Sequence, residues 1–235
     1  MKDKQYYIFL ADIKEEYMLF TDVLYENVKE LWTSFYSHPF VDGIGSGKLD
    51  KEKFKFYMIQ DYLYLLDYAK VYSLGVVKSE DEETMAKFSS LADGILNTEM
   101  SIHRNYMKKL GITNEEVENT KMSLHNASYT HYMLAVSYAG GVPEIAVSLL
   151  SCLWSYELIG KHLYNKYGIQ DNFYADWIRG YISEDYHKLN EWLLALVNKY
   201  SENISEKQKE KLIEIFVNTS RYEGLFWDMA YKGEM

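Results

Sequence analysis

The sequence predicts an all-α protein, built as a single-domain helical bundle. Only two prolines, Pro39 and Pro143, occur in 235 residues, whereas average usage of about 5% would give roughly a dozen. Because proline interrupts helix interiors, this scarcity permits long helices. Most segments also carry apolar residues at a 3.6-residue period, and no Asn-Gly or Asp-Gly turn joins two alternating apolar runs.

Local start signals position the helices along the chain. Asp50 precedes a long periodic segment, and Pro143 suits the first turn of another helix. Capping-box patterns occur at Ser79–Glu82, Thr113–Glu116 and Ser205–Gln208. The predicted helices span residues 22–37, 51–78, 80–110, 121–139, 143–167, 171–179, 183–201 and 205–231.

The chain shows no internal division. No linker rich in Pro, Gly or Ser interrupts it, and it contains no repeat or low-complexity segment. We therefore expect one all-helical domain over residues 21–235. Residues 1–20 form an N-terminal extension, and the sequence pattern does not distinguish an extra helix from an extended arm.

Charge and cysteine content exclude several classes of function. Lys and Arg total 25 and Asp and Glu total 35, so the net charge is −10, which disfavours nucleic acid and anionic membranes as partners. The single cysteine, Cys152, excludes an intrachain disulfide and a cysteine-based metal site, and suits a reducing compartment. No stretch approaches the roughly 20 apolar residues of a membrane helix. We expect a cytoplasmic protein.

Three polar groups interrupt the apolar stripes of predicted helices. Asp61 lies within the stripe that follows Asp50, where a carboxylate needs a hydrogen-bond partner, protonation or solvent. Cys152 shares a helix face with Tyr156, four residues on, and a lone cysteine is usually a small buried hydrophobe. Glu223 interrupts the last stripe, and a buried glutamate is either a proton donor or a structural group with a partner.

Together these residues suggest an internal pocket that contains a thiol, two carboxyl groups and several phenols. The chain has 23 tyrosines, whose flat apolar rings and hydroxyl groups suit a planar heteroaromatic ligand. The alternative is that the tyrosines line a large oligomer interface, where this residue type is also enriched.

Metal and cofactor patterns are weak. Glu184-x-x-His187 is a single motif, whereas a di-iron bundle needs two such motifs and two further glutamates. Glu99 and His103 share a helix face without a matching partner motif. The glycine-rich segment 43–47 lacks the lysine and the preceding strand of a phosphate loop, so we read it as a turn. We expect no metal and no cofactor.

Several motifs resemble those of one family. They are SHPFVDGIGSGKL at residues 37–49, the segment 56–65 with Gln60-Asp61-Tyr62-Leu63-Tyr64, LSCLWSY at residues 150–156, and the segment 222–231 with Tyr222-Glu223. In order and spacing they resemble the TenA/thiaminase II family, from about residue 24 to the C-terminus. Ser151 departs from the pattern, because many members carry proline there.

The resemblance implies a fold, an activity and an assembly. Members have the haem-oxygenase-like helical fold without haem, and commonly form homotetramers. They hydrolyse a leaving group from the 5-methylene of 4-amino-2-methylpyrimidines. The substrates are thiamine or 4-amino-5-aminomethyl-2-methylpyrimidine, and the hydroxymethyl product is salvaged into thiamine synthesis.

The resemblance also implies roles for individual residues. Cys152 matches the nucleophile, which adds to ring carbon C6, and Glu223 matches the acid/base beside the pyrimidine. Asp61 matches the carboxylate that holds the pyrimidine amino group, with the Tyr64 and Tyr156 hydroxyls as expected partners of Asp61 and the thiol. The substrate-binding residues it implies are Asp61, Tyr64, Tyr129, Tyr156, Tyr181 and the ring-stacking Phe226.

Two other classes of protein remain open at this point. A binding or regulatory protein on the same fold would keep a pyrimidine pocket without turnover, although it would have no use for a nucleophile. A metal-dependent oxidase on a related helical fold would need clustered His and Glu ligands.

Overall fold

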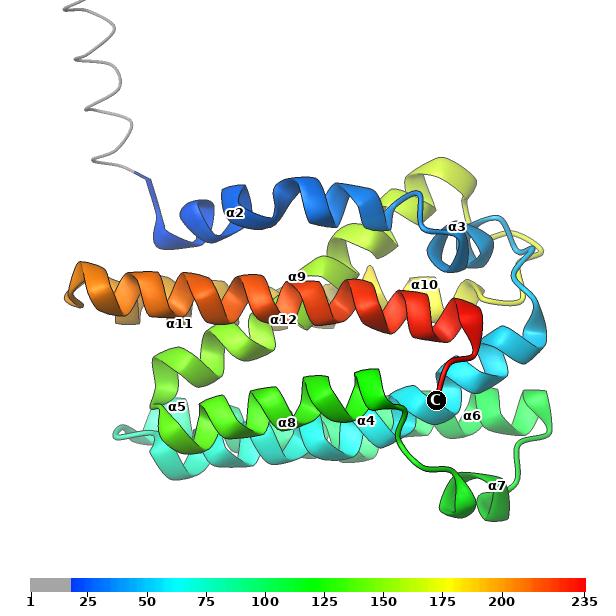
Figure 1. Ribbon diagram of the computed structural model, residues 1–235, viewed down its shortest axis with the longest axis horizontal. Coiled ribbons are helices and arrows are strands. Elements are labelled where there is room, and N and C mark those ends of the chain that lie inside the picture. Colours follow the sequence, from blue (N-terminus) through cyan, green and yellow to red (C-terminus); the bar gives the residue numbers. More distant parts are fainter. Residues whose placement is uncertain (1–17) are drawn as a thin grey trace, which may run out of the picture.

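The computed structural model describes residues 18–235, and every regular element in this part of the chain is a helix (Figure 1). This confirms the predicted all-α class. The first 17 residues of the expected N-terminal extension lie outside the described residues. The elements are α2 (Phe20–Phe35), α3 (Pro39–Gly45), α4 (Lys51–Lys78), α5 (Glu82–Gly94), the π-helix η1 (Ile95–Glu99), α6 (Met100–Leu110), α7 (Asn114–Asn119), α8 (Leu124–Ala139), α9 (Val142–Tyr167), α10 (Ala175–Tyr181), α11 (Glu184–Ser201) and α12 (Glu206–Lys232).

The predicted helices begin within four residues of the starts that the sequence predicts. The Asp50 carboxylate accepts the backbone N–H of Glu52 at 2.8 Å and so begins α4. The capping boxes Thr113–Glu116 and Ser205–Gln208 both form. Capping satisfies N–H groups that have no partner inside the helix, so these short polar patterns fix the starts of α7 and α12.

The capping box predicted at Ser79 is wrong. The Ser79 hydroxyl donates to the carbonyl of Gly75 at 2.7 Å, within the last turn of α4. Asp81 caps α5 instead, because its carboxylate accepts the N–H of Thr84 at 2.8 Å. A serine that bonds back to the preceding helix is unable to cap the next one.

Two further segments differ from expectation. The segment 43–47, which we expected to be a turn, mostly belongs to α3, since His38 caps this helix and Pro39 occupies its first turn. The single helix expected over residues 80–110 is instead α5, η1 and α6. The π-helical turns of η1 change the direction in which the side chains of α6 point.

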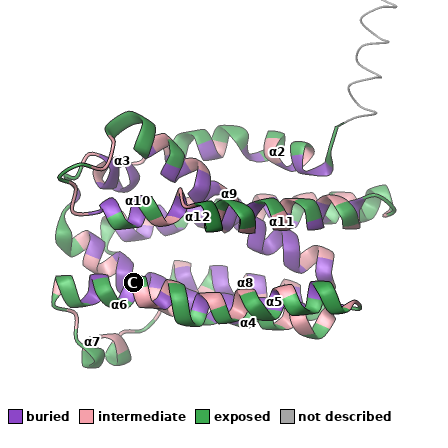
Figure 2. Cartoon of the chain, turned by 180° about the vertical axis from the view of Figure 1, so that it is seen from behind, coloured by how far each residue is buried: buried purple, intermediate pink, exposed green. Residues whose placement is uncertain are grey.

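α9 lies at the centre of the bundle. It contacts α3, α10, α11 and α12 on one side and α4 and α8 on the other, and Figure 1 shows it crossing between the two groups of helices. Its inward faces are buried (Figure 2). Residues placed on α9 therefore lie where all the layers meet.

α9 also corrects the expectation that no segment matches a membrane helix. Among the described residues, Val142–Tyr167 is long and apolar enough to cross a membrane by length and composition alone. However, 72% of its most apolar window is buried inside the protein. Its apolar character is that of a core helix.

Candidate functional site

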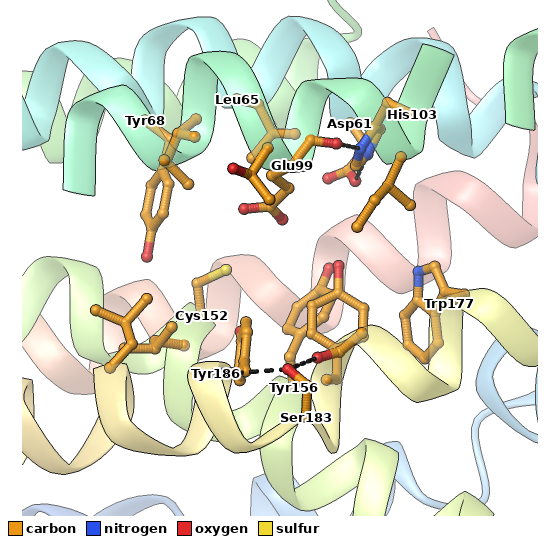
Figure 3. Close-up of a pocket in the computed structure, with 18 of the residues that line it drawn as sticks. Asp61, Leu65, Tyr68, Glu99, His103, Cys152, Tyr156, Trp177, Ser183 and Tyr186 are labelled. Atoms are coloured by element: carbon orange, nitrogen blue, oxygen red, sulfur yellow. Dashed lines mark hydrogen bonds and ion pairs between the residues drawn. The ribbon is translucent and has the colours of Figure 1, made fainter. Parts of the chain in front are cut away.

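A cavity of about 390 Å³ lies between α4, α5, η1, α6, α9, α10 and α11 (Figure 3). This volume suits a small organic molecule. Its walls are largely aromatic and apolar, and tyrosine is the most frequent residue type among them. The tyrosines that line it are Tyr64, Tyr68, Tyr72, Tyr106, Tyr156, Tyr181 and Tyr186.

Cys152 lines the cavity from α9, with its sulfur directed inward (Figure 3). Burial raises the pKa of the Cys152 thiol well above its usual value, and the nearby negative charge of Glu223 raises it further. The nearby Tyr64 hydroxyl opposes these effects without overcoming them. The thiol is therefore neutral near pH 7, and any reaction that needs its sulfur must first remove a proton.

Glu223 reaches the site from α12 and is only 2% exposed. Burial raises the pKa of Glu223 to about 8, and the charge of Asp61 contributes to this rise. The Tyr129 hydroxyl, which donates to Oε1 at 2.6 Å, and the nearby Cys152 thiol both lower the pKa of Glu223, against the effect of burial. At neutral pH the carboxyl group is thus protonated and lies beside the sulfur, as a proton donor requires.

Asp61 is buried on α4, and its partner is His103 of α6. Nε2 of His103 lies 2.6 Å from Oδ2 of Asp61. Nδ1 of the same ring lies 3.1 Å from the carbonyl of Glu99, which is only able to accept, so Nδ1 carries a proton. Tyr64, the partner we expected for Asp61, instead directs its hydroxyl at the sulfur of Met133.

The protonation of His103 follows from this arrangement. Burial alone would lower the pKa of His103, but the hydrogen bond and the charge of Asp61, with the charge of Glu99, outweigh it and raise the pKa. These interactions favour the charged form of the His103 ring. Since Oδ2 of Asp61 is engaged by this ring, Oδ1 remains available to a ligand.

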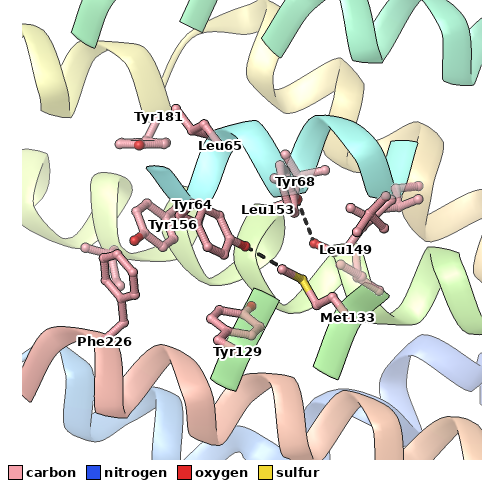
Figure 4. Packing of buried hydrophobic residues seen from close by; sticks show 14 of the residues in the cluster. Tyr64, Leu65, Tyr68, Tyr129, Met133, Leu149, Leu153, Tyr156, Tyr181 and Phe226 are labelled. Carbon is pink, nitrogen blue, oxygen red and sulfur yellow. Dashed lines mark hydrogen bonds between the residues drawn. The ribbon is translucent and has the colours of Figure 1, made fainter. Parts of the chain in front are cut away.

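The structure separates the eight sequence-predicted site residues into two groups. The first group lines the cavity and comprises Asp61, Tyr64, Cys152, Tyr156 and Tyr181. The second group, Tyr129, Glu223 and Phe226, does not line the cavity and is buried behind it. Tyr64 joins the two groups, because its ring lies 5.3 Å from that of Tyr129 and 5.8 Å from that of Phe226 (Figure 4).

Close aromatic packing holds the cavity walls in place. The rings of Tyr156 and Tyr181 lie 4.9 Å apart, and Trp227, with no exposed surface, packs against Tyr156 at 5.0 Å. Trp177 of α10 packs against Tyr181 at 4.6 Å. These contacts fix the tyrosine hydroxyls before any ligand arrives.

Three residues that line the cavity were not predicted as site residues from the sequence, namely Glu99, His103 and Tyr186. The spacing of Glu99 and His103 was visible in the sequence, but it suggested only an incomplete metal motif. Within residues 18–235, no group of three or more His, Cys, Asp or Glu side chains is arranged to hold a metal ion. Their place beside Asp61 depends on how α6 packs against α4.

The fold and the cavity together define an all-helical protein with an internal, aromatic small-molecule site. More particularly, the chain belongs to the TENA/THI-4/PQQC family, whose model matches residues 25–233. The aminopyrimidine aminohydrolase of Helicobacter pylori is 47% identical to it over 216 residues, which cover 92% of this chain and 100% of that protein.

Solved structures agree with this assignment. A TenA homologue from P. horikoshii OT3 superposes with a TM-score of 0.84 at 32% identity, covering 92% of this chain and 100% of that one. A domain from Shewanella denitrificans with a heme oxygenase-like fold superposes with a TM-score of 0.70 over 91% of this chain and 92% of its own. At 15% identity, the second similarity concerns the fold alone, and it bears out the expected haem-oxygenase-like bundle.

Proposed function

We propose that the protein is an aminopyrimidine aminohydrolase. It replaces the leaving group on the 5-methylene of a 4-amino-2-methylpyrimidine with a hydroxyl group, and thiamine salvage uses the product. The observation that carries the proposal is the Cys152 thiol at the wall of an aromatic cavity, with the protonated Glu223 carboxyl group buried directly behind that wall. The 47% identity to a protein named for this activity supports it.

The first step in the proposed mechanism is a proton relay. The pyrimidine amino group donates to the free Oδ1 of Asp61, which orients the ring. Glu223 gives its proton to ring nitrogen N1 while the Cys152 sulfur forms a bond to C6. The thiol proton then replaces the one that Glu223 lost, so a single proton moves overall and no thiolate is needed beforehand.

The second step expels the leaving group. Once the ring has lost its aromaticity, the bond from the 5-methylene to the leaving group breaks, and that group keeps the electron pair. Ammonia leaves from an ammonium group, or the neutral thiazole leaves from thiamine. Water adds to the methylene and gives up one proton to the solvent. The Cys152 sulfur then departs from C6 and regains its proton from Glu223, while N1 returns its proton to Glu223, which restores the thiol, the carboxyl group and the aromatic ring.

The remaining predicted residues then act on these groups. Tyr64, Tyr156 and Tyr181 form the walls against which the pyrimidine lies. Tyr129 adjusts the acidity of Glu223 through its 2.6 Å hydrogen bond. Phe226 acts through Tyr64, since its ring contacts Tyr64 rather than the cavity, so in this proposal it is a positioning residue.

Hydrolysis of thiamine and of 4-amino-5-aminomethyl-2-methylpyrimidine tests the function directly. We expect wild type to convert at least one compound and Cys152→Ser to convert neither. Ser155→Ala is the matched control, because the Ser155 hydroxyl lies on the same helix and bonds only to the Cys152 carbonyl. Tight binding of the pyrimidine by wild type without turnover would instead favour a non-catalytic binding or regulatory protein.

We further propose a cytoplasmic homotetramer. Large apolar side chains are exposed on neighbouring helices, namely Leu66 and Val77 on α4 and Leu124 and Tyr138 on α8. Val77 is 76% exposed and Leu124 is 75% exposed, which is typical of a surface that another subunit covers. Light scattering coupled to size exclusion tests the assembly, and a monomer of 27.7 kDa would refute it.

A further inference from the structure

Glu99 is a cavity residue that the proposed mechanism does not use. It is the last residue of η1 and lines the cavity. Figure 3 places it between Asp61 and Tyr68 on one wall, facing Cys152 across the cavity. Among the described residues, its carboxyl group has no hydrogen-bond or ion-pair partner, because only its backbone carbonyl contacts His103. A carboxyl group directed into an apolar cavity without a partner is costly unless a ligand satisfies it.

The charged groups around the cavity are mostly acidic. In residues 18–235, no lysine or arginine lines it, whereas Asp61, Glu99, Asp176 and Asp185 do. Asp176 is paired with surface bases, and Asp185 lies at the exposed rim. In the interior, one histidine, His103, therefore faces two acids, Asp61 and Glu99. When both acids are ionised, one negative charge is uncompensated, and a cation is the ligand that would balance it.

The position of Glu99 matches one point on the substrate ring. In the proposed mechanism Asp61 holds the amino group on C4 and Cys152 attacks C6. The substituent on C5 lies between those two positions, and Glu99 lies between Asp61 and the Cys152 side of the cavity (Figure 3). The charges of both Glu99 and Asp61 reach the thiol, so all three groups surround a single ligand site.

We propose that Glu99 binds the cationic leaving group on the 5-methylene and so selects charged aminopyrimidines over the neutral hydroxymethyl product. This inference rests on the proposed hydrolase function. An alkyl ammonium group is protonated near pH 7, as lysine is, whereas a hydroxymethyl group carries no charge. By holding the amine as an ammonium ion, Glu99 ensures that the bond breaks with release of neutral ammonia.

The burial of Glu99 suits this role. Burial raises the pKa of Glu99 to about 7, an effect that the charge of His103 opposes. A bound cation would favour the ionised form again, because an opposite charge close to a carboxyl group lowers its pKa. Once the leaving group has departed, the neutral product no longer compensates this charge, which favours release of the product.

The test compares Glu99→Gln with wild type and with Glu83→Gln, an exposed glutamate on α5. We measure kcat/KM for the aminomethyl substrate and the inhibition constant of the hydroxymethyl product. Loss of a hydrogen bond to a charged group predicts a fall in kcat/KM of about 10- to 100-fold. The inhibition constant should stay within about twofold, and Glu83→Gln should match wild type.

Two results would overturn the inference while leaving the hydrolase intact. One is an unchanged kcat/KM in Glu99→Gln. The other is an equal loss of substrate turnover and product affinity, which would indicate a purely structural role. If Glu99→Gln fails to fold, Glu99→Asp replaces it, and an intermediate fall in kcat/KM is expected.

A different result would count against the hydrolase alone. If wild type converts neither substrate, calorimetry with the aminomethyl and hydroxymethyl pyrimidines still decides the role of Glu99. Tighter binding of the cationic compound that Glu99→Gln abolishes would support the inference, whereas equal affinities would refute it.

Discussion

Replacing Tyr129 by phenylalanine should shift the pH dependence of catalysis upward. The Tyr129 hydroxyl donates to Glu223 at 2.6 Å and stabilises the ionised carboxylate, so its removal makes the carboxyl group a weaker acid. A hydrogen bond to a charged group contributes about 1.5–3 kcal/mol, and one pKa unit corresponds to about 1.4 kcal/mol. The pKa of Glu223, about 8 in wild type, should rise by about one to two units.

The assay is the pH profile of kcat/KM for the aminomethyl substrate, divided at each pH by the fraction of substrate in its ammonium form. That fraction is the same for both enzymes, so the difference between their alkaline limbs reports the enzyme group. Because Glu223 acts in its protonated form, the limb of Tyr129→Phe should move to higher pH, while the maximal rate falls.

Tyr132→Phe is the matched control. Tyr132 lies on the same helix, and its hydroxyl bonds to Asn218 rather than to Glu223. Its alkaline limb should coincide with that of wild type. A limb of Tyr129→Phe that stays in place or moves to lower pH would show that Glu223 is not the acid whose protonation governs the rate.

Three further changes have distinct expected outcomes. The pKa of Glu223 rises from 4.5 in the unfolded state to about 8 in the folded state. Between these pH values the folded state binds a proton that the unfolded state has lost, so the stability of wild type falls as the pH rises. Glu223→Gln should therefore be inactive yet more stable than wild type at pH 9 by several kcal/mol, and urea titrations with equal differences at pH 5 and pH 9 would contradict this. His103→Asn breaks a buried pair and should lower the free energy of unfolding by about 3–5 kcal/mol at pH 6. Since the folded pKa of His103 is raised, the stabilisation that His103 provides is fully present below about pH 6.5 and is lost as the pH rises through the folded pKa. A difference in unfolding free energy between wild type and His103→Asn that does not shrink in alkaline urea titrations would count against the ion pair. A Cβ at Gly160 would lie 3.0 Å from Cβ of Tyr181, so Gly160→Ala should push α10 outward and raise KM about tenfold, and an unchanged KM would show that the cavity wall tolerates the shift.

Helical periodicity was sufficient to single out two of the buried acids. Asp61 and Glu223 are visible in the sequence because each interrupts an apolar stripe, and a stripe specifies which face of a helix is buried. Both are buried in the structure, at 5% and 2% exposure. The same reasoning placed Cys152 and Tyr156 on a shared face, and both line the cavity.

The hydrogen-bond partners of these acids depend on how helices pack against one another. The apolar period of a single helix does not encode that packing. The pairing of Asp61 with His103 joins residues 42 positions apart, and the nearest candidate in sequence, Tyr64, proved to be the wrong partner. Glu99 escaped assignment for a second reason, because its spacing from His103 suggested only an incomplete metal motif. The helical period placed both residues on one face, and both line the cavity, but the period does not show which helix that face meets.

The π-helix η1 makes the effect of a change in chain length depend on where that change falls. Each residue of an α-helix turns the chain by about 100°, so deletion of one codon within α5 or α6 would rotate the residues on one side by that angle relative to the other. A π-helical turn contains about one residue more than an α-helical turn, so deletion of one codon within residues 95–99 would restore a continuous α-helix and leave the helices on either side in phase. His103 would then keep its place beside Asp61. Relatives that lack one residue in this segment should therefore be aligned with a gap at η1, so that the residues that follow it keep their positions in the cavity wall.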